Sequence, residues 1–173
     1  MVALIGSWWH EGARGLLSAS LGSACVVMYL LCVGRLSIVD VLHHRLPRAW
    51  VHQLTLVLGL GLPASALCAG EPARVLTSAA GALGTGLLYG TVRALSPGWL
   101  GRGDVRLAPA LGAACGFVAP GHAVAAVVLT FGACGAWGTF LVLSRRARPQ
   151  DRIAMGPWMS GCSTLVWLAL PPT

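Results

Sequence analysis

Long apolar runs alternate with short polar segments along this chain of 173 residues. A helix that spans a membrane needs about 20 mostly apolar residues. Runs of this kind predict six helices, over residues 17–39, 50–69, 75–95, 105–119, 122–143 and 153–170. The fourth is the shortest and contains Pro109, so we expect it to be tilted, kinked or only partly membrane-crossing. The pattern therefore predicts an all-α, polytopic membrane protein with about six transmembrane helices.

The composition agrees with a chain that lies in a lipid bilayer. Hydrophobic residues make up 56% of the sequence and charged residues only 10%, which excludes an ordinary soluble domain and a disordered chain. The length leaves room for one compact domain. We therefore expect a short extracytoplasmic segment over residues 1–15, followed by a single membrane-embedded domain over residues 16–173, with no nucleic acid as a partner.

The basic residues are distributed unevenly between the two sides of such a bundle. All 12 are arginines, and ten of them lie in or beside the loops that follow the first, third and fifth predicted helices. The other side has only Arg14 and Arg74. Since cytoplasmic loops carry the excess of basic residues, the loops around 40–49, 96–104 and 144–152 are predicted to be cytoplasmic and both termini to lie outside.

Tryptophans lie near the ends of the predicted helices. Trp50 and Trp99 adjoin the cytoplasmic loops, and Trp8, Trp9 and Trp167 lie near the outer ends. Tryptophan is enriched at both membrane–water interfaces. We therefore expect these side chains to anchor the bundle in the headgroup regions.

Small residues recur at helical spacing and predict close contacts between helices. The pairs are Gly86-x-x-x-Gly90, Gly112-x-x-x-Gly116 and Gly132-x-x-x-Ala136. The six cysteines all fall in apolar stretches and form no Cys-x-x-Cys pair, so they indicate small core residues rather than a zinc site or disulfides.

Only two of the five acidic residues lie at the end of a predicted span. Asp40 and Asp104 are both placed at the cytoplasmic side, at similar depth. An ionisable group at such a depth is costly and is a candidate functional residue. Two simpler interpretations stay open: Asp104 could cap the helix that follows it, and Asp40 could pair with Arg45 or Arg48.

The residues around these aspartates form two motifs. The first is Asp40-Val-Leu-His-His-Arg-Leu46-Pro47, and the second is Gly101-Arg-Gly103-Asp104-Val-Arg106-Leu, with Gly112 and Gly116 beyond it. Both resemble the signature of the type IV prepilin peptidase family, whose bacterial members are membrane-embedded Gly-x-Gly-Asp aspartic proteases. Gly156-Pro157, near the start of the last helix, also resembles the family pattern. The resemblance extends from about Leu16 to the end of the chain.

The sequence departs from the family pattern in three places. Arg106 replaces the usual Lys, and Arg48 follows Pro47 where Asn or Asp is common. Longer members also carry a zinc-binding cytoplasmic insertion with two Cys-x-x-Cys pairs, which accompanies N-methylation of the product. This chain has none, so it resembles the short form found with tight-adherence pilus systems, and we expect no methyltransferase activity.

The resemblance implies a function and a cellular location. The protein would be an aspartic endopeptidase of the bacterial cytoplasmic membrane, active at the cytoplasmic face. His43 and His44 adjoin Asp40, but adjacent residues on a helix do not share a face and no third ligand is evident, so we expect no metal or cofactor. Its substrates would be type IV or Flp-like prepilins or pseudopilins, cut after a Gly that precedes the apolar helix of the pilin. Asp40 and Asp104 would be the catalytic pair, with the acid and base roles left open, as is the oligomeric state.

Four further residues are candidates for the geometry of the site. Gly101 and Gly103 could adopt positive φ and let a substrate backbone approach closely. Pro47 could stiffen the loop after Asp40 and hold its neighbour extended. Arg106, with the neighbouring cytoplasmic arginines, could receive an acidic residue of the substrate.

Two other functions are compatible with parts of the pattern. A small helical transporter or channel subunit could use Asp40 and Asp104 to bind a proton or a cation, although both acids lie near the rim and not at the midplane. A catalytically silent assembly factor of the same fold is the other alternative. Intact acids in both motifs favour the peptidase.

Overall fold

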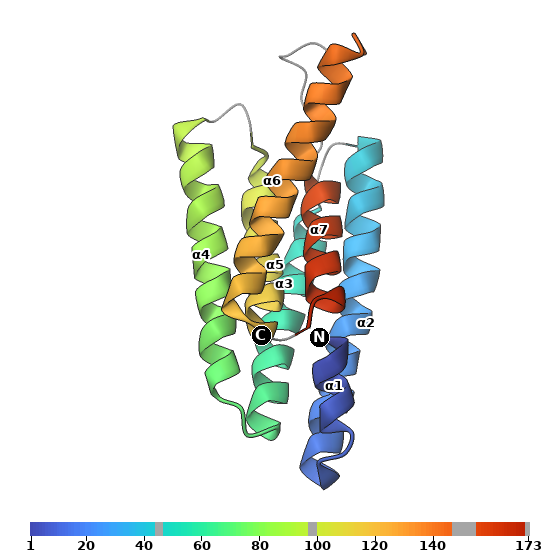
Figure 1. Ribbon diagram of the computed structural model, residues 1–173, viewed down its shortest axis with the longest axis vertical. Coiled ribbons are helices and arrows are strands. Elements are labelled where there is room, and N and C mark those ends of the chain that lie inside the picture. Colours follow the sequence, from blue (N-terminus) through green and yellow to red (C-terminus); the bar gives the residue numbers. More distant parts are fainter. Residues whose placement is uncertain (44–46, 97–99, 147–154, 172–173) are drawn as a thin grey trace.

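The computed structural model describes residues 1–43, 47–96, 100–146 and 155–171, and all regular structure within these ranges is helical (Figure 1). The helices run up and down the long axis of the bundle. Their bounds are α1 Val2–Trp8, α2 Gly12–His43, α3 Arg48–Cys68, α4 Ala73–Leu95, α5 Arg102–Val118, α6 Pro120–Leu143 and α7 Gly156–Ala169.

All six predicted helices are present, as α2 to α7. The helix missing from the prediction is α1, whose seven residues are too few for a search based on spanning length. Its side chains Leu4 and Trp8 are buried, and it packs along the lower part of α2 (Figure 1). The start of the chain is therefore part of the folded bundle.

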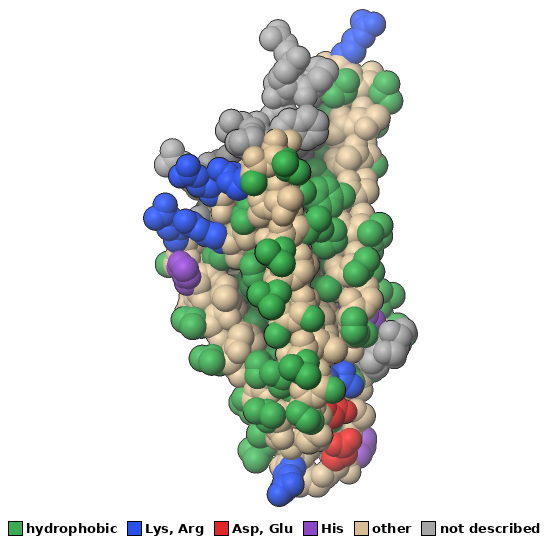
Figure 2. All heavy atoms as spheres, turned by 90° about the vertical axis from the view of Figure 1, so that its left-hand side faces the viewer, with side chains coloured by type: hydrophobic (Ala, Val, Ile, Leu, Met, Phe, Trp, Pro, Cys, Tyr) green, Lys and Arg blue, Asp and Glu red, His purple; other side chains and the backbone are tan. Residues whose placement is uncertain are grey.

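The architecture is that of an all-α polytopic membrane protein. Within the described residues, four helices, α2, α3, α4 and α6, are long and apolar enough to cross a membrane, whereas α5 and α7 have 17 and 14 residues. Figure 2 shows the side of the bundle on which α4 lies. Hydrophobic side chains cover most of its height, arginines are seen mainly toward the upper end, and acidic side chains are seen near the lower end.

The short helix α5 lies in the centre of the bundle, in contact with α3, α4, α6 and α7 (Figure 1). Nearly every residue from Leu107 to Val118 is buried. This segment is rich in glycine and alanine, so neighbouring helices can approach it from all sides. Pro109 lies inside the helix without ending it, and its ring faces Gly86 of α4.

The closest packing in the bundle joins α4 to α5. A methyl group on Gly112 would clash with the carbonyl oxygen of Gly81, and one on Gly116 would lie 3.1 Å from the α carbon of Gly81. Ser78 and Thr85 of α4 each donate a 3.0 Å hydrogen bond to a backbone carbonyl of α5. The predicted role of Gly112 and Gly116 in helix packing is thus confirmed.

The other two small-residue pairs differ from this one. Gly86 packs against Pro109, but methyl groups on Gly90 and Gly132 would meet no atom within 4 Å. The predicted close contacts at Gly90 and Gly132 are therefore wrong, because these glycines face open space.

The prediction that Trp8 and Trp167 anchor the bundle at the membrane surface is also wrong. Both side chains are buried, at 1% and 0% exposure. Trp8 packs edge-on against Phe117 of α5, and Trp167 packs edge-on against Tyr29 of α2 with ring centroids 4.5 Å apart. These rings fill the core between helices, so burial against other aromatic rings outweighs the preference of tryptophan for the interface.

The alternating directions of the helices determine which residues can meet. The last turns of α2, α4 and α6 and the first turns of α3, α5 and α7 lie at the same end of the bundle, which is uppermost in Figure 1. Asp40 in α2, Asp104 in α5 and Gly156 in α7 all belong to this end. Arg14 and Arg74 begin α2 and α4 at the opposite end.

Candidate active site

Both candidate aspartates are held on helices rather than on loops. Asp40 lies in the last turns of α2 and is 6% exposed, and Asp104 lies in the first turn of α5 and is 7% exposed. The rest of α2 and α5 packs firmly in the bundle, which fixes the backbone on which each carboxylate stands. Rigid helices of this kind hold functional groups more precisely than loops do.

The two carboxylates meet at the first residue of α7. A methyl group placed on Gly156 would lie 2.5 Å from Oδ2 of Asp40 and 3.7 Å from Oδ1 of Asp104. Because both oxygens are this close to one point, they lie within about 6 Å of each other, a separation at which two carboxylates alter each other's ionisation. The fold thus brings together two acids that are far apart in the sequence.

Asp104 also helps to start its own helix. The backbone N–H of Gly101, the residue before α5, donates a 3.1 Å hydrogen bond to Oδ2 of Asp104. The side chain of a helix's third residue commonly caps the helix start in this way. The interpretation of Asp104 as a capping residue is therefore partly right, and the same contact fixes the direction in which its carboxylate points.

Burial and a neighbouring charge change the acidity of Asp104, which lies outside the four helices that could span the membrane. Loss of contact with water and, next, the nearby carboxylate of Asp40 together raise the pKa of Asp104 from 3.8 to about 6. The hydrogen bond from Gly101 and the positive charge of Arg93 oppose this rise in pKa. Such a pair of acids retains a proton more readily than two isolated carboxyl groups.

Arg93 is also tied to the backbone that leads into α5. From the last turn of α4, its guanidinium donates a hydrogen bond to the carbonyl oxygen of Leu100, the residue before Gly101. Arg93 thus connects α4 to the backbone at the start of α5, and its positive charge also acts on Asp104.

The prediction that Gly101 and Gly103 adopt a positive φ is wrong. Gly101 has φ −67° and ψ 149°, and Gly103 lies inside the first turn of α5, so neither adopts a positive φ. The absence of a side chain matters at Gly101 for another reason. A methyl group there would lie 2.8 Å from Oδ2 of Asp104, in the space of the capping contact.

The remaining candidate residues lie on the first turns of α3 and α5, at the end of the bundle that holds the aspartates. Pro47 is half-buried at the start of α3, with an extended backbone, while Leu46 lies outside the described residues. Arg102 and Arg106 are exposed on the first turns of α5. They belong to the same end of the bundle as Asp104.

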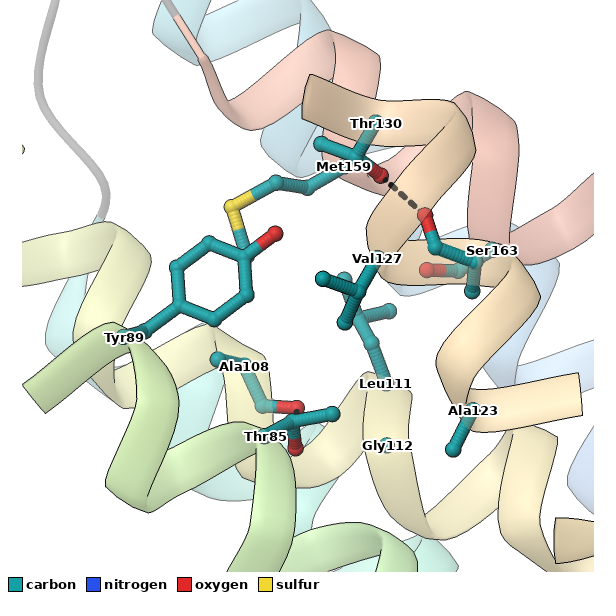
Figure 3. Close-up of a pocket in the computed structure, with 11 residues that line it drawn as sticks. Thr85, Tyr89, Ala108, Leu111, Gly112, Ala123, Val127, Thr130, Met159 and Ser163 are labelled. Atoms are coloured by element: carbon teal, nitrogen blue, oxygen red, sulfur yellow. Dashed lines mark hydrogen bonds between the residues drawn. The ribbon is translucent and has the colours of Figure 1, made fainter. Parts of the chain in front are cut away.

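A small cavity lies further into the bundle, between α4, α5, α6 and α7 (Figure 3). Its lining includes Ala108 and Met159, which lie one turn beyond Asp104 and Gly156 on α5 and α7. The ring of Tyr89 and the side chain of Thr85 border it from α4. Its volume of about 10 Å³ suits a single water molecule, so this cavity cannot receive a peptide.

The sequence does not predict Arg93 or Gly156 as residues of the site. Arg93 is one of several loop arginines, and nothing in the sequence places it near Asp104. Gly156 carries a signal, because the Gly156-Pro157 pair matches a known pattern, but the pattern alone does not say what the glycine touches.

A sequence model of the type IV leader peptidase family matches residues 25–143. The chain belongs to that family. The match contains the whole of both aspartate motifs and extends over α3, α4, α5 and α6. Membership identifies the protein as a membrane-embedded peptidase of the kind that acts on prepilin-type substrates. No curated protein and no solved structure matches the chain.

Proposed function

We propose that this leader peptidase is an aspartic endopeptidase in which Asp40 and Asp104 activate water. Its substrates are the leader peptides of type IV or Flp-like prepilins or pseudopilins, cut at the cytoplasmic face of the bacterial cytoplasmic membrane. The observation that carries the proposal is the meeting of the two buried carboxylates at Gly156.

The chemistry requires one proton to be shared by the pair. The ionised carboxylate removes a proton from water, and the water oxygen forms a bond to the carbonyl carbon of the scissile peptide. The protonated carboxyl group gives its proton to the departing nitrogen as the C–N bond breaks. The raised pKa of Asp104 supports this account, because the pair then keeps one proton up to a higher pH than two isolated carboxyl groups would.

The depth of the pair suits a bond at the membrane surface. The apolar stretch of α2 runs from Gly12 to Asp40, and its 29 residues span about 44 Å as a helix, longer than the roughly 30 Å of the hydrocarbon core. Asp40 lies in the last turn of α2, so we place it in the interfacial region. A substrate whose apolar helix stays in the bilayer would present the bond beside that helix to Asp40 and Asp104.

The proposal also states on which side of the membrane the site lies and whether the protein transfers methyl groups. The clustering of arginines at the end of the bundle that holds the aspartates supports a cytoplasmic site, with both chain termini outside. Methyl transfer is not included, since the sequence contains no Cys-x-x-Cys pair to build the zinc-binding insertion of longer members.

The test is co-expression with a tagged candidate prepilin, followed by gel analysis and mass measurement of the product's N-terminus. We expect a shorter, unmethylated product with the wild-type protein and with the exposed-site control Glu11→Gln, and none with Asp40→Asn or Asp104→Asn. Cleavage by either Asn variant would refute the assignment of the pair. Failure of the wild-type protein to cut any of several prepilins would refute the proposed substrates.

A further inference from the structure

The first residue of α7 leaves no space for a side chain. Gly156 is buried, and a methyl group on it would lie 2.5 Å from Oδ2 and 3.2 Å from Cγ of Asp40. Two such heavy atoms do not approach within 3.0 Å, so the carboxylate or α7 would have to move. Asp40 is only 6% exposed and has little free space around it.

The same group would lie 3.7 Å from Oδ1 of Asp104, which is ordinary contact distance. The α carbon of Gly156 therefore faces both carboxylates and is packed tightly against that of Asp40. The first turn of α7 also presents the positive end of its helix dipole on this side, which favours a negative charge on the pair. Asp40, Asp104 and the start of α7 thus form one contact group.

We propose that Gly156 is a positioning residue for the cleavage reaction: its lack of a side chain lets α7 begin against both carboxylates and sets the separation of Asp40 and Asp104. This inference rests on the proposed function for its catalytic consequence. The contact between Gly156 and Asp40 can be tested without it.

The chain offers a matched control on the same helix. Gly161 lies in the middle of α7, is exposed, and a methyl group on it would meet no atom within 4 Å. Gly156→Ala and Gly161→Ala add the same methyl group to the same helix. Only the first adds it beside the two acids.

The catalytic experiment compares kcat and KM of these two variants on a prepilin in lipid nanodiscs. We expect Gly156→Ala to lower kcat by about 100-fold with little change in KM, because a displacement of about 1 Å in a catalytic group has an effect of this size. Gly161→Ala is expected to retain wild-type values. A kcat for Gly156→Ala equal to that of wild type would overturn the proposal.

The second experiment measures thermal unfolding in detergent and does not depend on activity. We expect Gly156→Ala to lower Tm by roughly 3 °C or more, and the same substitution to have at most half of that effect in an Asp40→Ala background, where the crowded carboxylate is gone. An equal loss of Tm in both backgrounds would show that the contact with Asp40 is not the cause, and would overturn the proposal.

The two measurements also separate this inference from the proposed function. If wild-type protein cuts no prepilin, or if Asp40→Asn still cuts, the proposed function fails while the unfolding experiment still reports on the contact. If Gly156→Ala does not accumulate in a folded form, recovery of folded protein in the Asp40→Ala, Gly156→Ala double variant supports the contact. Absence of that recovery counts against it.

Discussion

Arg93, in the last turn of α4, donates a hydrogen bond to the carbonyl oxygen of Leu100. The next residue, Gly101, donates its own N–H to the carboxylate of Asp104. Leu100 and Gly101 thus connect the guanidinium on α4 to the carboxylate of Asp104 on α5. We expect Arg93 to hold Asp104 in place through this backbone and also to favour its ionised form.

Substitution of Arg93 should therefore change the pH dependence of cleavage. The positive charge of Arg93 lowers the pKa of Asp104 against the effects of burial and of Asp40. In Arg93→Gln this contribution is lost, so the pKa of Asp104 rises further and the pH–rate profile moves to higher pH. Arg93→Lys should retain most of the wild-type profile because it keeps the charge.

The control for the Arg93 variants is Arg146→Gln, which removes an exposed arginine at the same end of the bundle. Its profile should match wild type. Superimposable profiles for Arg93→Gln and the wild-type protein would show that Arg93 does not act on Asp104.

The raised pKa of Asp104 also predicts how stability depends on pH. A carboxyl group whose pKa rises from 3.8 unfolded to about 6 folded binds its proton more tightly in the folded state. The stability linked to that proton is fully present below about pH 4 and is lost as the pH rises through 6. The free energy of unfolding should therefore fall by on the order of 2–3 kcal/mol between these limits.

Thermal unfolding of Asp104→Asn should show a weaker dependence over the same pH range, since the titrating group is gone. Glu11→Gln, which changes an exposed acid at the opposite end of the bundle, should keep the wild-type dependence. A pH dependence that is unchanged in Asp104→Asn would mean that another group is responsible.

The packing of α4 against α5 gives a prediction about stability alone. A methyl group on Gly112 would lie well inside the contact distance of both Thr85 and Gly81. Gly112→Ala should lower the free energy of unfolding by about 1–3 kcal/mol, as overpacking does in other cores. Gly132→Ala, at a glycine with no atom near its methyl position, is the matched control and should leave Tm unchanged or higher.

The arginines at the start of α5 give a prediction about substrates. Arg102 and Arg106 are exposed beside Asp104, where they could attract an acidic residue near the scissile bond. Arg102→Glu should slow the cleavage of an acidic prepilin by about 10-fold at low salt, and less at high salt. The control is Arg14→Glu, at the opposite end of the bundle. Equal rates for acidic and neutralised substrates in wild type and in Arg102→Glu would remove this role.

The helices α2 to α7 could be predicted from the sequence because apolar length is a direct requirement of the bilayer. The site could be predicted in part, because Asp40 and Asp104 are acids in a chain that has few. The sequence did not show which helix faces would bring the carboxylates together, since that depends on how α2, α5 and α7 pack.

The wrong predictions have a common physical cause. Trp8 and Trp167 are chemically suited to a membrane interface, but aromatic partners in the core bury them. Gly101 and Gly103 are suited to a turn with positive φ, but a helix starts at this point. In each case a residue type allows two environments, and only the neighbours supplied by the fold decide between them.

The central claim is that Asp40 and Asp104 act as one catalytic unit. The most direct measurement is the single-turnover cleavage rate of a prepilin by purified protein in nanodiscs, compared among wild type, Asp40→Asn, Asp104→Asn and the double variant. We expect each single substitution to reduce the rate by about as much as the double substitution does, because residues that act as a unit lose activity non-additively. A single variant that retains substantial cleavage, or losses that simply multiply in the double variant, would contradict the account.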